Sequence, residues 1–320
     1  MTKDFLSLFD LSPDELEELF QLTDTLKVDP SRRPMAGKTA ALIFQKPSLR
    51  TRVSFEVGIY QLGGYPVFLS NESIGIGQRE PAADIARLLS RYNDLIIARL
   101  FEHSLLLELA RYSSIPVINA LTDLSHPCQV LADLYTIRRR GMLKKGIKIA
   151  FIGDGNNVVN SWLEASSLVP MHFILAAPNG YEPSREILER ARKSGVSQID
   201  IVTDPSEAAK HADVLYTDVW TSMGQEAESE RRRKDFAGYQ VNERLLALAK
   251  PDCVVMHCLP AHRGEEVSMG ILDGNHSIIF DQAENRLHVQ KAIMAKLMER
   301  HSAKSGRDGE RLSQHQPKLA

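Results

Sequence analysis

The sequence predicts an α/β protein with two doubly wound parallel-sheet domains joined by interdomain helices. Three observations support this prediction. The 320 residues suit two domains better than one, short apolar runs alternate with helical patterns, and the alternation pauses once, near residues 126–140. Because ligands of such proteins bind beyond the carboxyl ends of the strands, we expect substrates in a cleft between two lobes.

The first half begins with a capped helix and continues as strand–helix units. Ser12, Pro13 and Glu15 form the start signal of a helix. We expect strands at 39–44, 65–69, 94–99 and 117–119, helices at 52–62 and 82–91, and a Gly-rich loop at 70–81. A helix from Pro127 to the basic residues before Gly141 then closes a first domain, 1–140.

The second half repeats the alternation. We expect strands at 148–152, 173–176, 199–202, 214–217 and 254–257, with helices from 157, at 184–194 and at 205–211. These elements form a second domain, 141–284. A closing amphipathic helix at 285–301 is expected to pack back on the first domain. The polar, aperiodic segment 302–320 is predicted to be a disordered tail.

Composition narrows the function class. A net charge of −2 produces no global field toward nucleic acid or membrane, so an anionic ligand needs a local cluster of cations. Cys128, Cys253 and Cys258 are too few for a disulfide framework, and they form no CxxC pair for zinc. With neither a signal-peptide core nor an 18-residue apolar run, we expect a cytoplasmic protein without a membrane span.

The strongest local signal is the segment Lys46-Pro-Ser-Leu-Arg-Thr-Arg52, which lies between a strand and a helix. A helix N-terminus offers free N–H groups and a positive dipole end. Ser48 and Thr51 add hydroxyl groups, and Arg50 and Arg52 add forked cations. This pattern predicts a phosphate-binding site, and its structural alternative is a capped helix whose arginines point to solvent.

Two further candidates belong to the first half. His126 and Gln129 lie three residues apart on one face of a helix, where both can hydrogen-bond a carbonyl or an amide. Arg99 ends an apolar strand, so its guanidinium faces the cleft. The structural alternatives are a capping histidine with an incidental glutamine, and an edge arginine that points outward.

Loops after strands supply the candidates of the second half. Gly153 and Gly155 resemble a dinucleotide fingerprint, but Val158 replaces its third glycine and no carboxylate follows the next strand. Asn156 and Asn157 at a helix start suit a small carboxylate better. Other loops contain Asp218, which could hold an ammonium group or be a turn carboxylate, and Leu259-Pro260, which could be a cis bond. Arg286 stands at the start of the last helix.

Six motifs in this order resemble the ornithine carbamoyltransferases of the aspartate/ornithine carbamoyltransferase family, over residues 5 to about 300. They are Ser-x-Arg-Thr-Arg (48–52), Arg99, His-Pro-Cys-Gln (126–129), Asp-x-x-x-Ser-Met-Gly (218–224), His-Cys-Leu-Pro (257–260) and Glu-Asn-Arg (284–286). The resemblance implies a carbamoyl phosphate domain, an amino-acid domain, and a homotrimer whose active sites lie near subunit boundaries.

The resemblance also implies the role of each residue. Carbamoyl phosphate is expected to bind Ser48, Leu49, Arg50, Thr51, Arg99, His126, Gln129, Cys258, Leu259 and Arg286, and ornithine to bind Asn157, Asp218, Ser222 and Met223. Arg99, His126, Thr51 and Cys258 are the expected catalytic residues. The expected product is citrulline. Because the sequence shows no obvious dedicated base, the phosphate is the candidate proton acceptor, and we expect no metal, cofactor or nucleic-acid partner.

Two positions depart from the family pattern. Leu49 stands where the family commonly has Thr. A leucine at this position resembles the relatives that act on acetylornithine. Gly75 stands where a family member presents a polar side chain to the neighbouring subunit, and Gln78 and Arg79 are the candidates to replace it. An N-acylated ornithine, putrescine or aspartate is the alternative acceptor, and a nucleotide-binding or regulatory module is the rival class.

Overall fold

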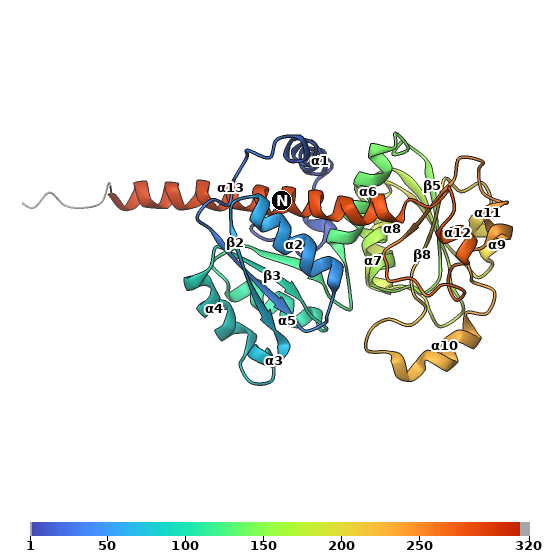
Figure 1. The fold of residues 1–320 in the computed structure, drawn as a ribbon, viewed down its shortest axis with the longest axis horizontal. Helices are drawn as coiled ribbons and strands as arrows, with labels where there is room; N and C mark the ends of the chain where they lie inside the picture. The colour runs from blue at the N-terminus through green and yellow to red at the C-terminus, as the bar shows by residue number, and fades with distance from the viewer. Residues whose placement is uncertain (1, 314–320) are drawn as a thin grey trace, which may run out of the picture.

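Two lobes, each built on a parallel sheet, make up the molecule (Figure 1). The computed structural model describes residues 2–313, and the side chains of residues 2–303. The sheets have the orders β2-β1-β3-β4 and β7-β6-β5-β8-β9, which confirms the predicted fold class. The strands are β1 (Thr39–Phe44), β2 (Tyr65–Ser70), β3 (Leu95–Arg99), β4 (Val117–Leu121), β5 (Ile147–Ile152), β6 (Met171–Ala176), β7 (Gln198–Val202), β8 (Val214–Thr217) and β9 (Val254–His257).

Helices pack on both sheets. Those of the first lobe are η1 (Leu8–Asp10), α1 (Pro13–Val28), α2 (Leu49–Gln61), α3 (Asn71–Ile74), α4 (Ala82–Tyr92) and α5 (His103–Tyr112). Those of the second lobe are α7 (Asn157–Ala165), α8 (Arg185–Ser194), α9 (Pro205–Ala209), η2 (Glu226–Glu228), α10 (Ser229–Asp235), α11 (Glu243–Leu246) and α12 (Met269–Leu272). The sequence did not predict α3, α10, α11 or α12, because helices this short show no clear apolar period. None of the described helices is long and apolar enough to cross a membrane.

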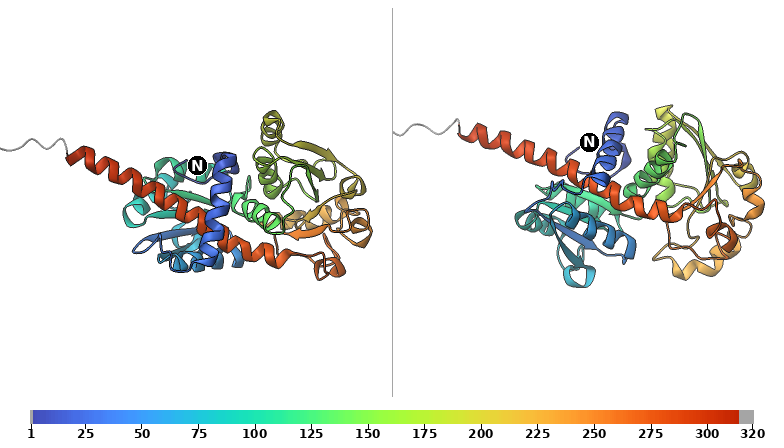
Figure 2. Two further views of the ribbon diagram at one scale, coloured as in Figure 1. Left: turned by 90° about the horizontal axis from the view of Figure 1, so that it is seen from above. Right: turned by 45° about the horizontal axis from the view of Figure 1, so that its top comes forward.

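Two helices connect the lobes. Helix α6 (Pro127–Arg139) is buried over most of its length, and one apolar core that includes Phe55, Leu131 and Trp162 runs through both lobes. Helix α13 (Ile279–Ser313) starts in the second lobe and crosses to α1 (Figure 2). There Lys296 pairs with Glu18 at 2.7 Å.

Helix α13 is longer than the predicted helix at both ends. It begins six residues before 285 and continues through 302–313, where the sequence predicts the start of a disordered tail. Residues 302–313 are largely polar, so the sequence shows no apolar face that would indicate a helix there. The remainder of the predicted tail, 314–320, lies outside the described residues.

The order of the strands determines where a ligand can bind. In the first sheet the chain passes from β1 out to β2 and returns to β3 on the other side of β1. In the second sheet the same reversal separates β5 from β8. Loops that follow strands on either side of such a switch point diverge and leave a crevice. Both crevices open into one cavity of about 1160 Å³ between the lobes.

Candidate active site

The cavity brings together every residue to which the family resemblance assigned a role. Its walls include Ser48, Leu49, Arg50, Thr51, Arg99, His126, Gln129, Asn157, Asp218, Ser222, Met223, Cys258, Leu259 and Arg286. The first lobe supplies the loop after β1, the end of β3 and the start of α6. The second lobe contributes the loops after β5, β8 and β9. Helix α13 contributes Arg286 from its second turn.

The N-terminus of α2 forms one end of the cavity. Ser48 has extended backbone angles and caps the helix, because its hydroxyl accepts a hydrogen bond from Thr51 N at 3.2 Å. The buried Thr51 hydroxyl accepts hydrogen bonds from Arg286 Nη2 at 2.8 Å and from Arg99 Nη1 at 3.5 Å. The helix dipole and two guanidiniums therefore converge on one point, which suits an anion.

Three guanidinium groups gather at this point. Each of Arg50, Arg99 and Arg286 has a buried Nε atom without a hydrogen-bond partner among the described residues. Burial lowers the pKa of all three groups. The charge of Arg286 lowers the pKa of Arg99 further, and that of Arg50 lowers both. Uncompensated buried cations are costly, so this arrangement favours the binding of an anion with several charges or acceptor oxygens.

The start of α6 adds two polar side chains. Burial and the charges of Arg286 and Arg99 lower the pKa of His126 well below its usual value, so the imidazole is neutral at pH 7. No described residue is a hydrogen-bond partner of His126 Nδ1 or of Gln129 Oε1, although both atoms are buried. Gln129 Nε2, by contrast, donates to Asp133 Oδ1 at 2.8 Å. A ligand with its own donors and acceptors would satisfy these atoms.

Arg52 does not join the cluster, and this part of the prediction was wrong. Its Nε donates to Glu56 Oε1 at 2.9 Å, and its guanidinium lies 3.6 Å from the centre of the Phe68 ring. Two positions along a helix rotate a side chain by about 200°, so Arg50 and Arg52 face opposite sides. Lys46 lines the cavity instead, where it pairs with Asp123 and lies over the Phe101 ring.

The opposite wall is centred on the buried carboxylate of Asp218. Its oxygens accept hydrogen bonds from Asn156 Nδ2, Cys258 Sγ and Val219 N, each at 2.8 Å. Burial and the neighbouring Asp218 charge raise the pKa of the Cys258 thiol well above its usual value. Cys258 is therefore a protonated donor and not a thiolate nucleophile.

The loop after β5 explains why the dinucleotide fingerprint fails. A Cβ atom at Gly155 would lie 2.4 Å from Pro183 N, and Gly155 N donates to Tyr181 O at 2.9 Å. The close approach of residues 181–183 therefore accounts for the glycine at 155 without a bound nucleotide. Asn156 caps α7 through Val158 N, and Asn157 donates to Thr122 O of the first lobe at 2.6 Å.

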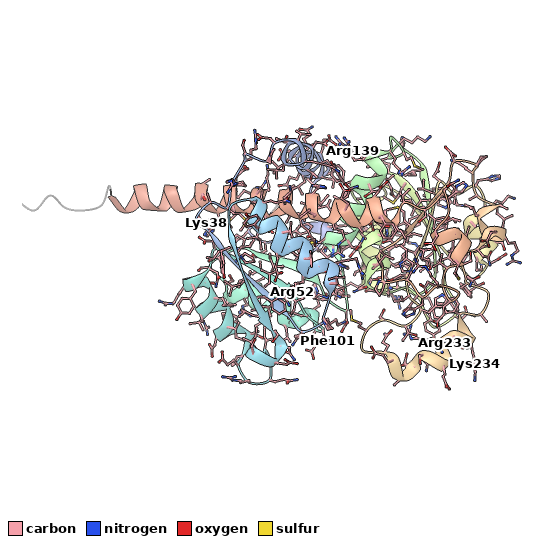
Figure 3. The ribbon with its side chains drawn as sticks, in the orientation of Figure 1. Lys38, Arg52, Phe101, Arg139, Arg233 and Lys234 are labelled. Atoms are coloured by element: carbon pink, nitrogen blue, oxygen red, sulfur yellow. The ribbon has the colours of Figure 1, made fainter. Side chains whose placement is uncertain are left out.

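The loop after β8 lines the cavity and approaches the first lobe. Ser222 and Met223 line the cavity, and a Cβ atom at Gly224 would lie 3.4 Å from the Phe101 ring of the first lobe. Figure 3 labels Phe101 at the edge of the first lobe, with Arg233 of α10 across from it.

Arg232 of α10 holds this loop in place, because it donates to Asp154 Oδ2 at 2.8 Å and to Trp220 O at 2.9 Å. Sequence reasoning missed Arg232, since its helix is too short to predict.

The loop after β9 completes the wall. Leu259 has a left-handed backbone (φ 60°), and its bond to Pro260 is cis, as the sequence suggested. The left-handed conformation is held by Leu259 N, which donates to His257 Nδ1 at 2.8 Å. His257 Nε2 in turn lies 3.0 Å from Glu266 Oε1 inside the lobe.

These features define a two-lobed α/β protein in which a cluster of buried guanidiniums and a buried carboxylate face one cavity. Family models for the aspartate/ornithine carbamoyltransferases match both halves: the carbamoyl-P binding domain at residues 3–139 and the Asp/Orn binding domain at 145–297. The chain belongs to the aspartate/ornithine carbamoyltransferase family.

Individual relatives agree with this assignment. The ornithine carbamoyltransferase of Chlorobaculum tepidum is 56% identical over 303 residues, which cover 92% of this chain and 90% of the relative. The solved ornithine carbamoyltransferase of Pyrococcus furiosus is 46% identical with a TM-score of 0.88, covering 92% of this chain and 97% of that one. The anabolic enzyme of Campylobacter jejuni is 42% identical with a TM-score of 0.89, covering 93% and 99%.

Proposed function

We propose that this chain transfers the carbamoyl group of carbamoyl phosphate to the δ-amine of L-ornithine, which yields L-citrulline and phosphate. One observation supports this function above the others. Three buried guanidiniums with unsatisfied Nε atoms, as counted over the described residues, line one side of a cavity whose other side presents the Asp218 carboxylate. An acyl phosphate and an amino acid with a free α-ammonium group complement these two sides.

Carbamoyl phosphate would bind on the first lobe, which makes residues 1–140 its domain. The N-terminus of α2 would receive the phosphate through Ser48, Leu49, Arg50 and Thr51. Arg99, His126 and Gln129 would surround the carbamoyl group. Arg286 of α13 would meet the ligand beside Thr51, and Cys258 and Leu259 would close the site from the second lobe.

Ornithine would bind on the second lobe, residues 141–284. Its α-ammonium group would meet Asp218, and its other polar groups would meet Asn157, Ser222 and Met223. Asp218 distinguishes the candidate acceptors, because an N-acylated ornithine has a neutral amide where ornithine has a cation. Putrescine lacks the α-carboxylate that polar groups of this wall would hold. The charge of Asp218 therefore favours free ornithine over an N-acylated ornithine.

The chemistry needs only positioning and charge stabilisation. The neutral δ-amine attacks the carbamoyl carbon, a new N–C bond forms, and the bond from that carbon to the phosphate oxygen breaks. Arg99, Thr51 and the neutral His126 would stabilise the negative charge that develops on the carbamoyl oxygen. The amine proton passes to the departing phosphate, and the protonated Cys258 acts as a hydrogen-bond donor.

The proposal includes a cytoplasmic homotrimer whose active sites lie near subunit boundaries. Leu49, Val53 and Tyr60 form an apolar strip on α2, with 77%, 45% and 75% of their surface exposed. These residues lie at helical spacing, and Leu49 also lines the cavity. A second copy that covers the strip would therefore lie beside the phosphate site. Sedimentation velocity would show a single species of three subunits.

A citrulline assay tests the proposed reaction. The purified protein should form citrulline from carbamoyl phosphate and ornithine, and should use N-acetylornithine, putrescine and aspartate at least tenfold less efficiently as judged by kcat/KM. A preference for N-acetylornithine or putrescine would overturn the acceptor assignment. Absence of any carbamoylated product would overturn the reaction itself.

A further inference from the structure

The side chain of Asp133 lies behind the carbamoyl end of the cavity and accepts hydrogen bonds from three different elements. It is fully buried on α6, one turn after Gln129. Its Oδ1 accepts from Gln129 Nε2 and from Gln282 Nε2 of α13, both at 2.8 Å. Its Oδ2 accepts from the Tyr216 hydroxyl of β8, also at 2.8 Å. Asp133 itself does not line the cavity.

A carboxylate determines how its neighbours turn. An ionised carboxylate only accepts hydrogen bonds, so the Gln129 amide must direct its NH₂ group to Asp133. The carbonyl oxygen of Gln129 is then the free end of the amide. It is buried, and no described residue is its hydrogen-bond partner, whereas Gln129 itself lines the cavity. An acceptor held in this way requires a donor from a ligand.

The ionisation of Asp133 is consistent with this orientation. Burial raises the pKa of Asp133 to about 7, although the three donors and the charge of Arg286 act in the opposite direction. Above that pH the carboxylate is mostly ionised and can only accept. Burial and the Asp133 charge also raise the pKa of the Tyr216 hydroxyl, which keeps Tyr216 a donor.

We propose that Asp133 is a positioning residue that turns the carbonyl oxygen of Gln129 toward the cavity, so that the site selects an acyl phosphate with an NH₂ group. This inference rests on the proposed function, because it specifies how the carbamoyl group is recognised. Acetyl phosphate has a methyl group where carbamoyl phosphate has NH₂, and it would leave the Gln129 oxygen unsatisfied. Sites built around such a hydrogen bond strongly reject analogues that lack it.

A double-mutant cycle tests the orientation. Gln129→Glu alone places two carboxylates in contact, and at pH 8.5 it should raise the KM for carbamoyl phosphate at least tenfold. Adding Asp133→Asn supplies an NH₂ donor to the introduced carboxylate at the expense of the bond from Gln282 Nε2. The other oxygen of that carboxylate can again accept from the carbamoyl NH₂. The double variant should recover at least tenfold of this loss. The double variant should also keep its preference for carbamoyl phosphate over acetyl phosphate. The inhibition constant of acetyl phosphate should therefore exceed the KM for carbamoyl phosphate.

The alternatives give different results. If the wild-type protein makes citrulline but the two substitutions change the KM additively, the role of Asp133 is overturned and the proposed function stands. A second result would also overturn the role of Asp133. If the double variant has the melting temperature of the wild type but binds acetyl phosphate as tightly as carbamoyl phosphate, residues 129 and 133 form a merely structural pair. A wild-type protein that forms no citrulline would overturn the proposed function instead.

Discussion

The two walls of the cavity differ in charge and in how far their polar groups are already satisfied. On the first wall, Arg50, Arg99 and Arg286 retain buried Nε atoms without partners among the described residues. On the second wall, Asp218 already accepts three hydrogen bonds. The first wall therefore has unsatisfied charge before a ligand arrives, whereas the second wall must exchange hydrogen bonds to receive a cation.

This difference indicates an order of events. An anion on the first wall relieves the mutual repulsion of three guanidiniums and gains their charge-assisted hydrogen bonds, each worth roughly 1.5–3 kcal/mol. An ammonium group on the second wall must compete with the donors from Asn156 and Cys258. We therefore expect the phosphate ligand to bind first, and its charge to assist the binding of the amine.

The largest effect is expected at Asp218. Asp218→Asn keeps the shape of the side chain and removes its charge, so it should raise the KM for ornithine by one to several decades. The reason is the roughly 2–5 kcal/mol cost of removing one partner from a desolvated charge pair. Steady-state kinetics would measure this change, with the KM for carbamoyl phosphate as internal control. Unaltered ornithine kinetics would show that the second wall does not bind the α-ammonium group through Asp218.

Arg99 should affect the chemical step more than ground-state binding. Arg99→Ala should lower kcat by one to two decades, because the developing charge on the carbamoyl oxygen loses a donor worth roughly 1.5–3 kcal/mol. The dissociation constant for carbamoyl phosphate should change less than kcat. The opposite result, lost binding with full turnover at saturation, would make Arg99 a ground-state anchor.

Arg50 and Arg52 offer a matched pair two residues apart. Arg50→Ala should raise the KM for carbamoyl phosphate about tenfold, since one charge-assisted hydrogen bond is lost. Arg52→Ala should change it less than about threefold, because Arg52 lies on the opposite face of α2, where it pairs with Glu56 away from the cavity. Equal effects of the two substitutions would contradict the division between the two faces of α2.

The smallest effect concerns buried charge outside the cavity. Glu164 of α7 accepts a hydrogen bond from Leu8 N at 2.8 Å, and burial raises its pKa to about 7. The folded state therefore binds the proton more tightly than the unfolded state, and stability falls as pH rises from about 4.5 to 7.

Glu164→Gln removes this loss. It should raise the melting temperature at pH 8 by a few degrees, corresponding to at most about 3 kcal/mol, and change it little at pH 4.5. The KM values should remain those of the wild type. A stability gain that is equal at both pH values would contradict the assignment.

The sequence was sufficient to predict the part of the first wall that comes from one local motif. Ser48, Arg50 and Thr51 lie within one turn of a helix start, so local rules were sufficient to find them. Arg52 was assigned to the same cluster, because the motif shows which residues are adjacent and not which way each side chain turns. All nine strands of the described chain were also predicted, since buried parallel strands are continuous apolar runs.

Other features depend on contacts between distant segments. Asp133 meets Tyr216 and Gln282 only after the lobes have packed, and its position one turn after Gln129 was the single local signal. Arg232 belongs to a seven-residue helix without a clear period. The helical conformation of 302–313 could not be predicted either, because that segment is largely polar and shows no apolar face.

Isothermal titration tests the contrast between the two walls most directly. Carbamoyl phosphate should bind the free protein with a measurable dissociation constant, whereas ornithine alone should bind at least tenfold more weakly than it does in the presence of a non-reacting phosphate ligand. This result would show that a ligand on the first wall strengthens the binding of ornithine to the second wall. Equal affinity for ornithine with and without the phosphate ligand would contradict the account.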